Sequence, residues 1–190
     1  IGLAELEIFD ASNGSLDTWF FMGNSITSGA FHNRITPSFA QVVAANHPGY
    51  TPAMINGGFS GSRTGEGVQQ ISGYLTVNPD LHFWCLEYGT NDSRDGYDTL
   101  VFRNNLDTMI SKIMAAGHVP MIAQVPWSVQ NYSVTPKYSR QIDALNKKYS
   151  LLPGPDLFTW FKNHPTELKT NDVHPNDIGD ASMNRLWAEA

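Results

Sequence analysis

Continuous apolar runs alternate along this chain with longer stretches in which apolar residues recur every three or four positions. The runs predict buried β-strands and the periodic stretches predict helices. The predicted strands are residues 19–22, 54–56, 81–87 and 119–125, with a last short strand within 151–157. The predicted helices are residues 36–46, 64–75, 97–116, 135–149 and 175–188.

The order of these elements decides the fold class. Strands that alternate with helices predict an α/β fold with a mostly parallel sheet. Right-handed crossovers then place helices on both faces of the sheet. We therefore expect a three-layer α/β/α sandwich around a mostly parallel, flavodoxin-like sheet of about five strands.

The first fifteen residues differ from the rest. Residues 1–10 alternate apolar and acidic side chains, which predicts a half-buried strand, and residues 11–15 predict a turn or linker. The strand is either an edge strand of the main domain or the end of a preceding domain, since it resembles the last strand of a discoidin-type, galactose-binding-like sandwich. We therefore divide the chain into residues 1–15, an N-terminal strand and linker that could end a neighbouring carbohydrate-binding domain, and the main domain, residues 16–190.

Composition narrows the classes of partner. The 190 residues suffice for one domain with a full core, and the net charge of −6 argues against nucleic acid as a partner. No apolar stretch is long enough to cross a membrane. Only 16% of residues are charged, which we interpret as the surface of a secreted or extracellular protein that faces carbohydrate. The single cysteine, Cys85, excludes an internal disulfide and a cysteine-rich metal site, and its apolar neighbours predict a buried, inert thiol.

Four polar segments follow the predicted strands or precede the last helix, and ligands of α/β sheets bind at the carboxyl ends of the strands. The segments are Gly23-Asn24-Ser25, Asn56-Gly57-Gly58, Gly89-Thr90-Asn91-Asp92 and Asp172-Val173-His174. In the first, an apolar run delivers a serine to the rim of the sheet. We predict that Ser25 is a nucleophile.

A serine hydroxyl is a weak nucleophile and needs a base within hydrogen-bond reach. Of six histidines, His82 and His118 flank predicted core strands and His47 sits in a Pro-Gly turn, which favours structural roles. His174 alone has both acidic or amide residues just upstream and a helix just downstream. It is the predicted base.

In this order, the four segments resemble the SGNH hydrolases, a branch of the GDSL esterases and lipases, over residues 18–190. Gly-Thr-Asn-Asp after an apolar strand is the most specific part of the resemblance. The resemblance implies Ser25 as nucleophile and His174 as base, and an oxyanion held by the backbone N–H of Ser25, the backbone N–H of Gly58 and the side-chain amide of Asn91. It implies an esterase without metal or organic cofactor.

Two positions depart from the family pattern. The family usually has Gly-Asp-Ser where this chain has Asn24, and it places an acid three residues before the histidine, where this chain has Asn171. Three groups could therefore orient His174: Asp172 after a reshaping of the turn, Asn171 as a neutral acceptor, or a backbone carbonyl. We predict Asp172, because a nearby carboxylate stabilises the imidazolium most.

Trp127 follows Val125-Pro126 at a predicted strand end, so we expect it to line the site, where an aromatic ring could stack on a sugar. Arg63 is expected to be a solvated surface residue, and Trp84 a core residue. The expected function is a serine esterase that removes a short acyl group, which we predict to be acetyl, from small-molecule or glycan esters, above all from carbohydrates. The alternatives are a lipase or thioesterase for longer acyl chains, and a catalytically impaired pseudo-enzyme that only binds glycans.

Overall fold

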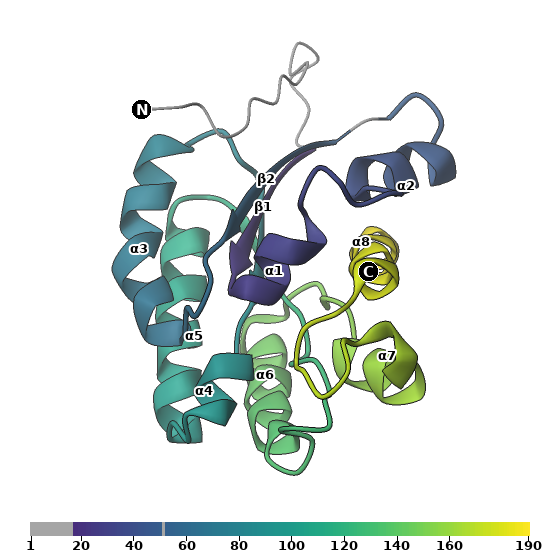
Figure 1. The fold of residues 1–190 in the computed structure, drawn as a ribbon. Helices are drawn as coiled ribbons and strands as arrows, with labels where there is room; N and C mark the ends of the chain where they lie inside the picture. Colours follow the sequence, from purple (N-terminus) through teal and green to yellow (C-terminus); the bar gives the residue numbers. More distant parts are fainter. Residues whose placement is uncertain (1–16, 51) are drawn as a thin grey trace, which may run out of the picture.

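The structure is a computed structural model that describes residues 17–50 and 52–190. The strand and linker predicted at residues 1–15 lie outside the described residues. The structure therefore does not test whether these residues end a carbohydrate-binding domain. Figure 1 shows a central sheet with helices on both faces.

The sheet consists of four parallel strands in the order β2-β1-β3-β4. Their bounds are Thr18–Gly23 (β1), Ala53–Gly58 (β2), Phe83–Glu87 (β3) and Val119–Ile122 (β4). The predicted α/β class and parallel sheet are confirmed. Because the chain adds β2 on one side of β1 and β3 on the other, the strand order reverses at β1, and such switch points hold the ligand sites of open α/β sheets.

The expected count of about five strands was one too high for the described residues. Residues 151–157 contribute only an isolated parallel bridge between Ile122 and Pro153. Pro153 and Pro155 lack the backbone N–H that a ladder requires, so the strand does not form. For its part, β4 ends at Ile122 rather than at the predicted Val125.

The helices form the two outer layers. Their bounds are Ser25–Ala30 (α1), Phe39–Asn46 (α2), Thr64–Val77 (α3), Thr90–Arg94 (α4), Thr99–Ala115 (α5), Thr135–Tyr149 (α6), Leu157–Asn163 (α7) and Asp177–Glu189 (α8), with a 3₁₀ turn at Pro165–Glu167. Helices α1, α4 and α7 were not predicted, because each has too few residues to display a helical period. Helix α2 begins at Phe39 rather than at the predicted residue 36, because Ser38 and Gln41 form a capping box at its start.

Alternate side chains of the strands point into two cores. Phe20, Trp84 and Leu86 pack with α3, α5 and α6 on one face, and Phe21 and Cys85 pack with α1, α2, α7 and α8 on the other. This alternation is the period of two expected of a strand. Trp84 and Cys85 are buried as predicted, and burial raises the pKa of the Cys85 thiol well above its ordinary value.

Candidate active site

The turn after β1 presents Ser25 at the carboxyl edge of the sheet. A side chain at Gly23 would meet Thr27 Oγ1 and the Glu87 carbonyl oxygen, so only glycine fits there. Asn24 caps α1 by accepting a hydrogen bond from the N–H of Ile26 at 2.8 Å. Ser25 is the first residue of α1, where backbone N–H groups have no acceptor within the helix.

Ser25, His174 and Asp172 form a hydrogen-bonded chain. Ser25 Oγ lies 2.7 Å from His174 Nε2, and His174 Nδ1 lies 2.8 Å from Asp172 Oδ1. Desolvation acts to raise the pKa of Asp172, but the hydrogen bonds from His174 and from the N–H of Val173 outweigh it and lower this pKa. Asp172 is therefore a carboxylate near neutral pH, and the arrangement can remove a proton from Ser25.

The Asp172 contact depends on an unusual turn. Asn171 has a φ of 52°, in the left-handed region, and its carbonyl oxygen accepts a hydrogen bond from Gln130 Nε2. Downstream, the His174 carbonyl oxygen accepts a hydrogen bond from the N–H of Lys169 at 2.9 Å. Of the three arrangements considered from the sequence, the structure contains the one in which Asp172 reaches His174.

Asn91 lies in α4, which follows β3, and is buried. One hydrogen of its amide is donated to the Ser62 carbonyl oxygen at 2.9 Å. Next to it, Asp92 accepts hydrogen bonds from Thr64 Oγ1 at 2.5 Å and from the Thr64 N–H at 3.2 Å. The Gly-Thr-Asn-Asp segment thus anchors the loop after β2, and the second amide hydrogen of Asn91 has no acceptor among residues 17–50 and 52–190.

The Gly58 N–H, predicted to bind the oxyanion, already has an acceptor in this structure. Its N–H donates a hydrogen bond to Asn56 Oδ1 at 3.0 Å, and a side chain here would clash with the backbone of Ser28. Gly58 must lose that bond before it can donate to an oxyanion. Further along the loop, Gly61 has a φ of 79°, and its N–H has no protein acceptor within residues 17–50 and 52–190. The sequence does not mark the Gly61 N–H as a donor, because a left-handed φ in a loop leaves no periodic signal.

Three aromatic side chains lie in the loops that follow β2 and β4. The N–H of Phe59 binds the Gly23 carbonyl oxygen, and the Phe59 side chain is 61% exposed. Trp127 is half-buried against the core beside α1, α7 and α8, with its ring 6.4 Å from that of the exposed Tyr132. The placement of Trp127 is compatible with the predicted substrate contact.

Arg63 is less free than the sequence suggested. It pairs with Asp95 at 2.7 Å and with Glu66 at 3.3 Å, and its guanidinium lies 5.3 Å from the centre of the Tyr97 ring. These contacts hold the side chain over the start of α3, where 30% of it stays exposed to solvent, as expected of a surface residue.

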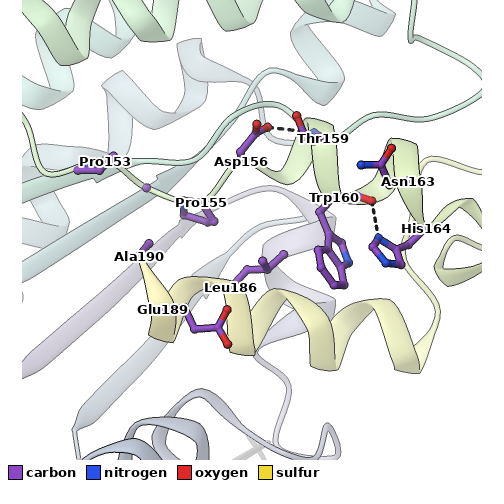
Figure 2. A pocket seen from close by; sticks show the side chains of 11 residues that line it. Pro153, Pro155, Asp156, Thr159, Trp160, Asn163, His164, Leu186, Glu189 and Ala190 are labelled. Carbon is purple, nitrogen blue, oxygen red and sulfur yellow. Dashed lines mark hydrogen bonds between the residues drawn. The ribbon is translucent and has the colours of Figure 1, made fainter.

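A separate hollow lies between α7 and α8, remote from Ser25 in the chain (Figure 2). Its volume is about 560 Å³, and its lining includes Asp156, Trp160, His164, Leu186 and Glu189. The His164 ring stacks on Trp160 at 3.8 Å, and Arg185 lies 4.4 Å from the centre of the same indole. The hollow does not contain the Ser25–His174–Asp172 chain.

Within the described ranges, no group of three or more His, Cys, Asp or Glu side chains is arranged to hold a metal ion. None of the helices described there has the length and apolar content needed to span a membrane.

Comparison with known proteins identifies a matching family and a relative of similar length. A sequence profile of the GDSL-like lipase/acylhydrolase family matches residues 21–181, a range that contains Ser25, Asn91, Asp172 and His174. An arylesterase from Vibrio mimicus is 28% identical over 187 residues, which cover 92% of this chain and 90% of that protein.

Solved structures share the fold. A lipase/acylhydrolase from Enterococcus faecalis has a TM-score of 0.75 at 19% identity, over 90% of this chain and 93% of that one. An acetylxylan esterase from Geobacillus stearothermophilus has a TM-score of 0.76 at 14% identity, over 91% and 93% of the two chains. An esterase from Pseudoalteromonas, inhibited by monoethylphosphonate, has a TM-score of 0.70 at 14% identity, over 89% and 92%.

Proposed function

This chain belongs to the GDSL-like lipase/acylhydrolase family, and we propose that it is a serine esterase that removes short acyl groups, above all acetyl, from carbohydrates. One observation carries the proposal: the hydrogen-bonded chain from Ser25 Oγ through His174 to Asp172. A serine, a base and a carboxylate in this order are the parts that nucleophilic acyl transfer requires.

In the first half of the proposed reaction, Ser25 Oγ attacks the ester carbonyl carbon and its proton passes to His174 Nε2. The carbonyl oxygen becomes an oxyanion, and Asp172 stabilises the imidazolium that has formed. When the tetrahedral intermediate collapses, the bond to the alcohol oxygen breaks and the alcohol leaves with the proton from His174. The acyl group remains on Ser25 as an ester.

In the second half, His174 Nε2 accepts a proton from a water molecule that attacks the acyl carbon. A second tetrahedral intermediate forms, and its collapse breaks the bond to Ser25 Oγ, which recovers the proton. The carboxylic acid leaves, and the protein's own side chains supply every proton transfer.

Donors for the oxyanion come from three elements. The N–H of Ser25 lies at the start of α1, and the free hydrogen of the Asn91 amide lies in the first turn of α4. The loop after β2 would provide the third donor, either Gly58 once Asn56 releases it or Gly61, whose N–H has no acceptor in the described chain. Such donors stabilise the transition state because they are held in place before charge develops.

The choice of a carbohydrate acetyl ester rests on several features. The chain carries few charges, 16% of residues, and the loops that follow β2 and β4 carry Phe59, Trp127 and Tyr132. Aromatic rings of this kind can stack on sugar rings, and Trp127 is the proposed substrate contact. Among proteins of the same fold, acetylxylan esterases act on such esters, as their names state. The proposal includes a secreted or extracellular location.

A first test measures hydrolysis of nitrophenyl esters of increasing acyl length and release of acetate from acetylated xylan. The proposed esterase should favour acetyl over octanoyl esters and should release acetate from xylan. Ser25→Ala should abolish both activities, whereas Ser72→Ala, a matched change at an exposed position of α3, should not. Rates that rise with acyl length would instead favour a lipase or thioesterase.

The pseudo-enzyme alternative makes a different prediction. It requires no ester hydrolysis by the pure protein, together with glycan binding that survives Ser25→Ala. The geometry argues against a pseudo-enzyme. Although Asn171 stands where the family usually has its acid, Asp172 supplies a carboxylate within hydrogen-bond distance of His174.

A further inference from the structure

Behind the nucleophile turn lies a buried acid that the proposed reaction does not use. Glu87 ends β3 beside Gly23 of β1, and it is 1% exposed. An acid in this position needs partners for its oxygens, because an unpaired buried carboxylate is strongly destabilising.

Both carboxylate oxygens of Glu87 are bound by the first turn of α1. Thr27 Oγ1 donates to Oε2 at 2.8 Å, and Asn24 Nδ2 donates to Oε1 at 3.3 Å. The same amide lies 3.4 Å from the Glu87 carbonyl oxygen. These partners stand on either side of Ser25 in the chain, so Glu87 connects the end of β3 to the turn that presents the nucleophile.

Asn24 makes a second hydrogen bond in the same turn. While its nitrogen faces Glu87, its oxygen accepts the N–H of Ile26 and caps α1. An asparagine can do both because its amide is a donor and an acceptor. An aspartate could keep the cap but could not donate to Glu87.

We propose that Glu87 is a positioning residue that holds Ser25 in register with His174 through Asn24 and Thr27, and that residue 24 is an amide because Glu87 faces it. This inference rests on the proposed function of Ser25. It accounts for the departure from the Gly-Asp-Ser pattern: two carboxylates about 3 Å apart cannot both be ionised, so an aspartate at residue 24 would have to share a proton with Glu87 or move away.

Other charges near Glu87 reinforce this interpretation. Burial raises the pKa of Glu87 to about 7, the hydrogen bonds from Thr27 and Asn24 oppose the rise, and the charge of Asp92 adds to it. Asp92 is itself buried, with a raised pKa caused by desolvation. Burial already disfavours the ionised forms of Glu87 and Asp92. A carboxylate at residue 24 would add a further negative charge beside them.

The test is a double-mutant cycle of Asn24→Asp and Glu87→Gln, with nitrophenyl acetate as substrate at pH 8. Asn24→Asp should lower kcat about 10²-fold, the loss that a displacement of about 1 Å produces, with little change in KM. In the Asn24→Asp background, Glu87→Gln should raise kcat at least about tenfold, because the glutamine amide can donate to the carboxylate that this background introduces. In the wild-type background the same change should lower kcat. This reversal of sign is not expected of a purely structural residue.

Additive effects would overturn the proposal. If Glu87→Gln lowers kcat by the same factor in both backgrounds, residues 24 and 87 are not energetically coupled. If Asn24→Asp does not fold, Thr27→Val and Thr27→Ser decide the question. The valine should lower kcat with KM unchanged and the serine should restore it, whereas equal kcat values for the two variants would contradict the proposal.

Matched controls carry the same changes elsewhere: Asn104→Asp on the exposed surface of α5 and Glu189→Gln at the end of α8. Both should match the wild type. Ser25→Ala separates the two hypotheses. Activity that survives in Ser25→Ala refutes the proposed function, whereas an inactive Ser25→Ala beside an additive cycle refutes only the role of Glu87.

Discussion

Asp172 Oδ1 lies 2.8 Å from His174 Nδ1, although a single residue separates the two in the chain. Asn171 makes this possible, since its left-handed backbone conformation bends the turn so that Asp172 folds back onto the imidazole. The same carboxylate oxygen also accepts the N–H of Val173 at 2.6 Å, which fixes its direction. The contact between Asp172 and His174 therefore depends on the local backbone geometry as much as on the presence of an aspartate.

Replacing Asp172 by Asn should lower kcat by about 10²–10⁴ with little change in KM, because an amide holds the wrong tautomer of His174 and cannot stabilise its cation. Steady-state kinetics on nitrophenyl acetate measures this. Asn171→Gly is the matched control: it removes the side chain but tolerates the left-handed φ of 52°, and it should retain most of the activity. If Asn171→Gly is the slower variant, Asp172 is not the orienting group.

Asn91→Ala should lower kcat about 10²–10³-fold, the loss typical of one oxyanion donor. Asn91 also binds the Ser62 carbonyl oxygen, so thermal unfolding should be measured in parallel. Asn105→Ala on α5 removes a comparable amide, one that donates to Thr64 Oγ1, and should leave kcat near that of the wild type. Equal losses in the two variants would argue against an oxyanion role for Asn91.

Trp127→Ala should raise KM for acetylated xylan about tenfold while changing KM for ethyl acetate little, because ethyl acetate has no ring that could stack on the indole. Acetate release measured over a range of xylan concentrations tests this. Trp160→Ala in the hollow between α7 and α8 is the matched control. A KM for xylan that is unchanged in Trp127→Ala would remove this residue from the substrate site.

Glu87 should make stability depend on pH. Its folded pKa of about 7 exceeds its ordinary value, so between these two values the folded protein holds a proton that the unfolded chain has lost. Stability therefore falls as pH rises through this window and is level above it. The free energy of unfolding of the wild type relative to Glu87→Gln should drop by up to about 3 kcal/mol between pH 4.5 and 7.5.

Urea denaturation of both proteins at pH 5 and pH 8 measures that difference. The subtraction removes the contributions of other groups, including Asp180, whose pKa burial raises to about 6. Glu189→Gln should follow the wild type at both pH values. Parallel pH dependences of the wild type and Glu87→Gln would show that Glu87 does not titrate differently in the two states.

The α/β class, the parallel sheet and the segments that meet at its carboxyl edge could be predicted from the sequence, because strand and helix periods and strand-end motifs are local properties. Ser25, Asn91 and His174 could be selected in this way. Short helices could not, since α1, α4 and α7 are stabilised by packing and caps rather than by a visible period.

The hydrogen-bond partners of these residues could not be predicted, because they depend on contacts that form when the chain folds. Whether Asp172 or Asn171 faces His174 depends on one backbone dihedral angle, and whether the Gly58 N–H is free depends on the side chain of Asn56. The link between Glu87 and Asn24 spans 63 positions and arises because β3 pairs with β1. Hydrogen bonds between segments distant in the chain follow strand pairing, which leaves no mark at either residue, so only the folded molecule shows why an amide stands beside the serine.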